Sequence, residues 1–276
     1  MNTQKEIRPT MKIAKYTLAD EVRQRSFVVM FVMCVAFVFL TRGCYQGNYM
    51  VNGQALDAGT VVGAVSKATF HVIAVAVMLL AALLSMRAFR RDRDSGMQSS
   101  ILAKPITRRQ YVTGKVLGLW ALSTCFMFVL HAVLFLIASL TLKEAMPGYL
   151  AASLLCSFNL LFVVVAVLLL SLLVPDFVAF LCVVGIGVAG LATDGIYALS
   201  QSRIVTAMVP QPDVSWGKLV YYIWPKVSGA QYFASAFIDG EVPRGFGSAY
   251  PLINILFYCL ILGALLFRRF GNEEII

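Results

Sequence analysis

Six apolar stretches of roughly membrane-spanning length divide the chain, and they constrain its fold more than any other feature. They cover residues 27–40, 68–89, 116–140, 150–174, 177–199 and 252–267. A helix needs about 20 mostly apolar residues to cross the hydrocarbon core of a bilayer. The first stretch is short, and Ser26 and Thr41 extend it. The sequence therefore predicts an all-α membrane protein with six transmembrane helices.

Composition excludes a soluble domain of this size. Of the 276 residues, 59% are hydrophobic and only 13% are charged, whereas a soluble domain carries about 25% charged residues. A water-soluble fold has too little interior to bury so many apolar side chains. The link Val174-Pro175-Asp176 leaves open one long kinked helix, but we expect two helices because Pro cannot continue the preceding hydrogen-bond ladder.

The distribution of charge orients the chain. With both termini inside, the inner segments hold 16 basic and eight acidic residues, and the rest of the chain holds seven and six. Lys and Arg accumulate on the cytoplasmic side of membrane proteins. We therefore expect both termini in the cytoplasm and the chain in a bacterial cytoplasmic (inner) membrane.

Residues 1–25 predict a cytoplasmic tail and a helix lying in the headgroup region, ahead of a transmembrane domain over 26–276. They are polar and lack a cleavage site for a signal peptide. Four apolar residues recur at helical spacing, and basic and aromatic side chains flank them: Met11, Ala14, Leu18 and Val22, with Lys12, Lys15, Tyr16 and Arg23. The alternative is an ordinary basic tail held near anionic lipid.

The outer segment 200–251 is too long to be a plain loop. Two of its stretches, 219–225 and 230–237, are apolar and aromatic but too short to span a membrane. We expect two short interfacial or re-entrant helices there, with Tyr and Trp at headgroup depth.

Polar residues inside the spans offer little chemistry. His71 and His131 fall in the second and third spans. Two histidines on different helices permit a haem between them, but polar residues facing the bundle interior explain them better. Asp194 lies near the outer end of the fifth span and is interpreted as a helix-end residue. We expect no catalytic residues, no metal site and no cofactor on this chain.

Glycines mark two candidate helix contacts. Gly114 and Gly118 stand four apart at the inner entry of the third span, and Gly185, Gly187 and Gly190 cluster in the fifth. Small residues let helix backbones approach closely, within a bundle or between subunits. The alternative is the ordinary abundance of glycine in membrane helices. No glycine-rich phosphate loop occurs, so any nucleotide hydrolysis belongs to a partner.

The segment 87–115 between the second and third spans is the most distinctive part of the sequence. Eight basic residues and only two acidic ones fall there, which marks a cytoplasmic loop. It contains Asp94-Ser95-Gly96, then Leu102-Ala103-Lys104-Pro105-Ile106-Thr107-Arg108, then Tyr111, and finally Gly114-Lys115 entering the third span.

This segment resembles the loop between spans two and three in permeases of type-2 ABC exporters. In that family an acidic residue and a Gly precede a Leu-x-x-Pro-Ile-x-Arg sequence, an aromatic residue and Gly-Lys. The usual Glu before the Gly is not at its common place, and Asp94-Ser95-Gly96 is the nearest equivalent. The resemblance extends in outline over the whole chain, through the interfacial helix, the six spans, the long outer segment and the closing Phe267-Arg268-Arg269-Phe270.

The resemblance implies a transmembrane subunit of an ATP-driven exporter that works by alternating access. A separate cytoplasmic ABC ATPase would carry ATP and Mg, and a second permease copy or a paralogue would complete a dimer. Spans two and five would line the path, and no nucleic acid would be involved. Seven residues are expected to couple the two subunits: Arg90, Arg91, Asp94, Gly96, Pro105, Arg108 and Arg109.

Other interpretations stay open at this point. The arginines of the loop suit pairing with carboxylates on a partner, but they also suit anionic lipid headgroups and fix topology. A membrane anchor or assembly scaffold that does not transport, or a redox subunit with haem on His71 and His131, is an alternative function. The cargo cannot be read from the sequence.

Overall fold

The computed structural model describes residues 3–23, 25–41, 43, 50–51, 54–55, 58–143, 146–200, 221–238, 240 and 246–272. Its elements, in chain order, are α1 (Thr3–Val22), α2 (Arg25–Thr41), β1 (Met50–Val51), β2 (Gln54–Ala55), α3 (Ala58–Met86), α4 (Ala88–Asp94), α5 (Met97–Leu102), α6 (Arg108–Leu142), α7 (Gly148–Ser171), α8 (Asp176–Ser200), α11 (Val227–Ala236) and α12 (Phe246–Gly271). Apart from the antiparallel two-residue pair β1–β2, the described fold is helical.

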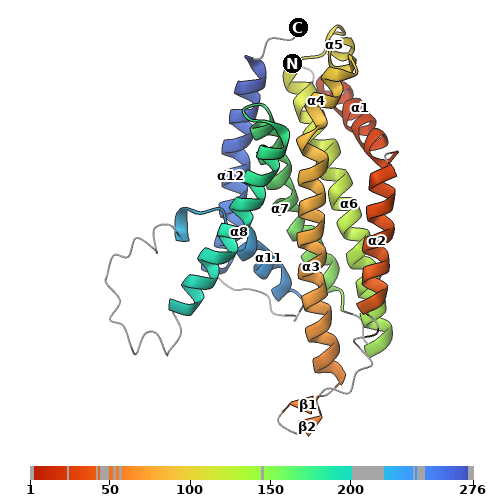
Figure 1. Ribbon diagram of the computed structural model, residues 1–276, viewed down its shortest axis with the longest axis vertical. Helices are drawn as coiled ribbons and strands as arrows, with labels where there is room; N and C mark the ends of the chain where they lie inside the picture. Colours follow the sequence, from red (N-terminus) through yellow and green to blue (C-terminus); the bar gives the residue numbers. More distant parts are fainter. Residues whose placement is uncertain are drawn as a thin grey trace.

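Six helices run along the long axis of the molecule: α2, α3, α6, α7, α8 and α12 (Figure 1). Both termini lie at the end that carries α1, α4 and α5, and β1–β2 lies at the other (Figure 1). We call the first end the basic end. The two termini on one side agree with an even number of crossings.

The six predicted spans correspond to these six helices. Five of them are long and apolar enough to cross a membrane, and α2 counts as a sixth only when it is joined to α1. With 17 residues, α2 is about 25 Å long, at the lower limit for a span. The all-α membrane fold is confirmed, with α3 and α6 reaching well beyond the predicted boundaries.

Helix α7 forms the centre of the bundle. It packs against α3, α6, α8, α11 and α12, and every residue from Phe162 to Leu169 is buried. A helix that is apolar on all sides is stable only when other elements surround it. The run Phe162 to Leu169 therefore serves as the common core against which the other helices pack.

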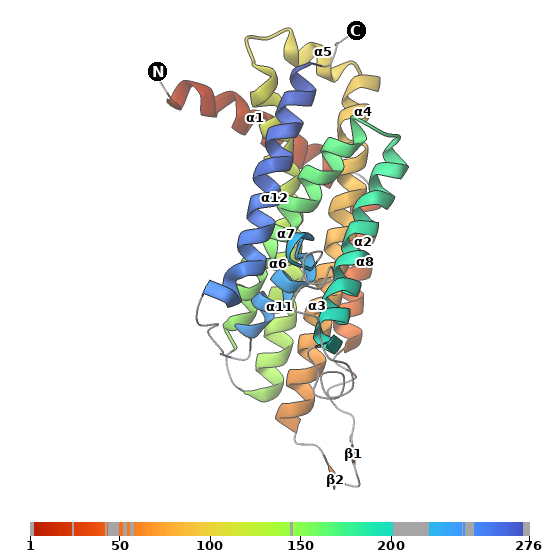
Figure 2. The same cartoon turned by 90° about the vertical axis from the view of Figure 1, so that its left-hand side faces the viewer.

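Helix α1 crosses the basic end at a steep angle to the bundle, as an interfacial helix would (Figure 2). It is bent by 71° relative to α2. Its buried face consists of Ile13, Ala14, Thr17 and Glu21. Of the stripe expected to form its apolar face, only Ala14 is buried, whereas Met11, Leu18 and Val22 are 49%, 37% and 39% exposed. Helix α1 thus has a packed face and a separate, exposed apolar flank.

Glycine makes the close contact between α1 and α6 possible. A Cβ placed on Gly114 would lie 2.7 Å from the Ile13 side chain, and one on Gly118 would lie 2.8 Å from the Ala14 carbonyl oxygen. In the fifth span the picture differs. A Cβ on Gly185 or Gly187 would meet none of the described residues within 4 Å, while one on Gly190 would approach Trp224 and Pro225.

The outer segment contributes one deeply placed helix. Residues 221–223 are helical and α11 follows at 227–236, close to the second short helix that we expected. Helix α11 packs against α7, α8, α12 and α3. Much of the segment, including 201–220 and 241–245, lies outside the described residues.

We expect Gly118→Ala to destabilise the protein even though Ala is the better helix former by about 1 kcal/mol. The added methyl group must displace the backbone of α1 at Ala14, and overpacking costs about 1–3 kcal/mol. The measurement is the thermal unfolding midpoint of detergent-purified protein. Gly263→Ala on α12 is the matched control, because no described atom lies within 4 Å of its added methyl; its midpoint should stay equal or rise. Equal effects of the two changes would contradict this account.

Candidate functional site

A helical hairpin, α4–α5, projects from the basic end (Figure 1). Gly96 forms the turn between the two helices with φ of 68°, a left-handed conformation that glycine adopts at little cost. Pro105 follows α5, and Thr107 then starts α6 with a capping box, in which its side chain accepts from the Gln110 backbone N–H and the Gln110 side chain accepts from the Thr107 N–H. The predicted loop 87–115 is therefore mostly helical.

A buried ion pair ties this hairpin to α6. The Lys115 Nζ lies 2.6 Å from the Asp92 Oδ2, and the two side chains are 3% and 2% exposed. The Tyr111 hydroxyl donates to the same oxygen at 2.5 Å. Breaking a buried pair leaves an uncompensated charge, which costs about 3–5 kcal/mol. Asp92 therefore holds α4 in one position on α6.

Three aromatic rings pack beside this pair. Phe89 of α4, Tyr111 of α6 and Phe270 of α12 have ring centroids 5.1 to 6.2 Å apart. All three side chains are buried. Offset or tilted aromatic pairs at this range add about 0.5–1.5 kcal/mol beyond their buried area. The hairpin is thus packed against the end of α12 as well as against α6.

Arg91 connects the same hairpin to α1. Its guanidinium lies 2.7 Å from the Asp20 carboxylate and also donates to Glu21. Burial raises the pKa of the Glu21 carboxyl, and the Arg91 guanidinium opposes that rise. The pKa of Arg91 itself is raised: burial lowers it, but the hydrogen bond to Glu21 and the charges of Glu21, Asp20 and Asp92 together outweigh that effect. Helix α1 and the hairpin are therefore joined directly through Arg91.

Arg90 makes weaker contacts. It lies 3.4 Å from Asp176 at the start of α8 and 3.9 Å from Asp94, with its own side chain 68% exposed. Exposed pairs of this kind contribute about 0–1 kcal/mol. The link between the hairpin and α8 can therefore break and reform easily.

The predicted coupling residues divide into two groups. Gly96 and Pro105 shape the exposed outer surface of the hairpin, to which Asp94 and Arg90 also belong. In contrast, the Arg108 guanidinium donates to the Gly271 carbonyl oxygen at 2.8 Å, and Arg109 lines a groove with α1 and α12. On α1, the residues Lys12, Lys15, Tyr16 and Arg23 are all exposed.

The residues that hold the hairpin escaped the sequence interpretation. Asp92 and Glu21 entered it only as charges, Lys115 as a charge and as part of the Gly-Lys motif, and Tyr111 only as the aromatic residue of that motif. One signal was available, because Tyr111 and Lys115 stand four apart and so share one face of α6. A hydroxyl and an amine on one helix face suit a carboxylate acceptor, but the position of α4 opposite that face is a tertiary fact.

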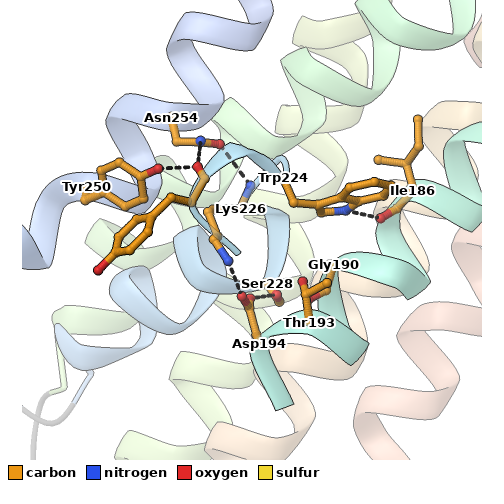
Figure 3. Close-up of polar contacts among 10 residues, drawn as sticks. Ile186, Gly190, Thr193, Asp194, Trp224, Lys226, Ser228, Tyr250 and Asn254 are labelled. Atoms are coloured by element: carbon orange, nitrogen blue, oxygen red, sulfur yellow. Dashed lines mark hydrogen bonds and ion pairs between the residues drawn. The ribbon is translucent and has the colours of Figure 1, made fainter. Parts of the chain in front are cut away.

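A second polar cluster fixes α11 inside the bundle (Figure 3). The Lys226 Nζ lies 2.6 Å from the Asp194 Oδ1 of α8, with side chains 2% and 17% exposed. The Ser228 hydroxyl donates to the other Asp194 oxygen. Asp194 therefore accepts two bonds from the start of α11 rather than serving only as a residue at a helix end.

Further bonds anchor α11 and the residues before it to three other helices. The Lys226 backbone N–H donates to Asn254 of α12 at 3.0 Å, and the Trp224 indole donates to the Ile186 carbonyl oxygen of α8 at 3.1 Å (Figure 3). On α11 itself, the Gln231 amide donates to the His71 carbonyl oxygen of α3. Trp224, expected at headgroup depth, is instead bonded to the middle of α8.

Both histidine rings lie against Phe70. The His131 ring stacks on Phe70 with centroids 4.3 Å apart, and its Nε2 lies 3.4 Å from the Phe70 carbonyl oxygen. The His71 ring packs against Tyr232. Both rings therefore pack against aromatic side chains of the bundle.

An apolar cavity of about 120 Å³ lies beside α11, between α3, α7 and α8. Met78 and Leu79 of α3 and Gly187 and Val188 of α8 line it, and Ser228 and Gln231 are its polar residues. Ligand pockets are usually about 300–1,000 Å³, so this cavity must enlarge before it can hold a sizeable molecule.

Replacing Lys115 by Met should lower the thermal unfolding midpoint by roughly 5–10 °C, because the Asp92 carboxylate is then buried without its cation. Adding Asp92→Asn should restore part of the loss, since the amide needs no counter-charge. Lys104→Met, an exposed lysine of the same segment, is the control and should change little. A double variant as unstable as the single one would contradict the ion-pair account.

Replacing Lys226 by Met should loosen α11 from α8. We expect hydrogen exchange of the amides in 227–236 to accelerate by about tenfold or more, as the link to Asp194 is lost. Asp194→Asn keeps an acceptor for Ser228 but leaves the buried Lys226 ammonium without its counter-charge, so it should accelerate exchange as well. Lys143→Met, an exposed lysine at the end of α6, should leave exchange in α11 unchanged. Unaltered protection in the Lys226 variant would show that packing alone holds the helix.

Comparison with known proteins places the chain in a family. No curated protein matches it. A family model described as ABC-2 family transporter protein matches residues 11–275, which is nearly the whole chain. The match covers α1 from Met11 onward, the α4–α5 hairpin, α11 and all the long helices described above. The chain therefore belongs to the ABC-2 family of membrane transporter proteins.

Proposed function

We propose that this chain is the permease subunit of an ATP-driven exporter, with ATP hydrolysed on a separate cytoplasmic ABC ATPase. Two permease subunits, identical or paralogous, would form the transport path and alternate between inward-open and outward-open states. The family match supports a transport role. The observation that carries the proposal is the α4–α5 hairpin, which is exposed on its outer surface and rigidly tied on its inner one.

The outer surface of the hairpin suits docking to a partner. Its exposed residues include Asp94, Ser99, Ser100, Lys104 and Pro105. Exposed charged and small polar groups suit a surface that a second protein can cover. Their charges can fix how that partner is aligned on the hairpin. We assign this surface as the docking site of the ATPase.

The inner surface of the hairpin suits force transmission. Movement of α5 must carry α4, which is continuous with α3 through Arg87. Asp92 passes the same movement to α6, and Arg91 passes it to α1. The Arg90–Asp176 pair with α8 is exposed and weak, so it would break before the buried contacts with α6 and α1. Rigid-body displacement of one group of helices past another is a common switching mechanism.

The cavity between α3 and α8 marks where a path would open. Its lining is apolar apart from Ser228 and Gln231, which favours a lipid-like, amphiphilic or peptide cargo. On α8, Gly185 and the exposed Leu181, Val188 and Leu191 present an apolar surface. We assign this surface of α8 to contact with the second permease subunit.

The basic end would face the cytoplasm of a bacterial inner membrane. The excess of Lys and Arg at this end supports that orientation. The same charges would be attracted to the anionic inner leaflet. Export is then movement from the basic end toward the end that carries β1–β2.

The test is purification in mild detergent from the native host, with identification of co-eluting proteins. Wild type should retain an ATP-binding subunit, and Ala103→Glu/Lys104→Glu on the hairpin tip should lose most of it, because charge is reversed on the docking surface. Lys143→Glu at the far end of α6 is the matched control and should retain it. If wild type retains no ATPase under conditions that keep membrane complexes intact, the scaffold interpretation replaces the exporter.

A further inference from the structure

A large groove opens at the basic end. Its volume is about 1290 Å³, and residues of α1, α6 and α12 line it. Helix α1 packs against α6 beside Gly114 and Gly118. The groove is distinct from the apolar cavity beside α11.

Three arginines form the upper wall of the groove. They are Arg108 and Arg109 in the first turn of α6 and Arg268 in the last turn of α12. Among the described residues that line the groove, none is acidic. Arg109 and Arg268 are exposed, whereas Arg108 is partly buried and bonded to Gly271. Guanidinium groups bind phosphate oxygens with strong, often bidentate hydrogen bonds.

The floor of the groove is apolar. Leu117 of α6 and Ala264 and Phe267 of α12 line it. Below Ala264, the α12 side chains Leu260 and Ile261 are 74% and 40% exposed, so the floor continues into an apolar flank of a membrane-crossing helix. Cations above and an apolar channel below match a molecule with an anionic head and hydrocarbon tails.

We infer that this groove binds an anionic phospholipid of the inner leaflet, with its phosphate on Arg109 and Arg268 and one acyl chain along α12. The membrane position of the groove supports a lipid rather than a protein. Helix α1, which forms one wall, has the exposed apolar side chain Met11 in the groove itself. A lipid there would contact both α1 and α12, which line the groove together.

The test is native mass spectrometry of the full-length protein in detergent, titrated with phosphatidylglycerol or with phosphatidylcholine of the same acyl chains. Wild type should bind the first phosphatidylglycerol more tightly than the first phosphatidylcholine. Arg109→Gln/Arg268→Gln should weaken phosphatidylglycerol binding roughly 30-fold, at about one kcal/mol per arginine near the surface. Its phosphatidylcholine binding should not change.

Two further variants separate a built site from diffuse attraction. Ala264→Trp keeps every charge but fills the floor, and it should also abolish the preference for phosphatidylglycerol. Lys12→Gln/Lys15→Gln removes the same charge from the exposed face of α1, outside the groove, and should change the first affinity by less than about threefold. Thermal unfolding midpoints check that each variant is folded.

Several results would overturn the inference. Equal binding of both lipids by wild type would do so, as would a loss in the Lys12/Lys15 control equal to that in the arginine variant. Glu273 and Glu274 follow the groove in sequence and lie outside the described residues. If phosphatidylglycerol binds selectively only after Glu273→Gln/Glu274→Gln, the chain's own terminus occupies the groove.

Co-purification of the ATPase with each variant separates this inference from the proposed function. If Arg109→Gln/Arg268→Gln loses the ATPase while keeping its lipid preference, the groove is a protein-docking site and the lipid assignment is wrong. The hairpin-tip variant Ala103→Glu/Lys104→Glu should leave the lipid preference intact. Lipid binding can therefore be lost while ATPase docking is kept, and ATPase docking can be lost while lipid binding is kept.

Discussion

The buried contact between Asp92 and Lys115 determines how the basic end is built. A carboxylate and an ammonium that are both almost fully buried hold each other in place, because separating them would leave each charge uncompensated in an apolar setting. Tyr111 satisfies the same carboxylate oxygen. Around this pair the fold packs Phe89 and Phe270, and next to it Arg91 reaches α1. Four helices, α1, α4, α6 and α12, therefore meet around the α4 residues Phe89, Arg91 and Asp92.

This arrangement explains how a short hairpin can act on long helices. Helices α4 and α5 hold only seven and six residues, too few to be stable alone in water. Their stability comes from their inner face, which leaves the outer face available for a partner. The contrast with Arg90 is informative. It pairs at the surface with Asp94 and Asp176, where screening keeps such contacts weak, so the hairpin is firmly joined to α6 and α1 and loosely joined to α8.

The opposite part of the bundle follows a related principle. Helix α11 is short, and its polar residues would be costly inside a membrane protein if they had no partners. Lys226, Ser228 and Gln231 find partners on α8 and α3, and Asn254 of α12 accepts from the Lys226 backbone. The apolar cavity borders this helix. A movement that separates α8 from α3 must therefore either carry α11 with one of them or break these bonds.

The sequence alone determined the membrane class, the six long helices, the interfacial helix and the position of the basic loop, because each depends on local composition, helical length or charge bias. It also located Gly114 and Gly118, although not the helix they contact. It could not show that Asp92 rather than the exposed arginines holds the hairpin, that Asp194 pairs with Lys226, or that Arg108 and Arg109 face α12. Those facts depend on which helix faces lie opposite one another. In a bundle that choice is made by packing around α7 and by the need to pair every buried charge, which no single segment of the sequence specifies.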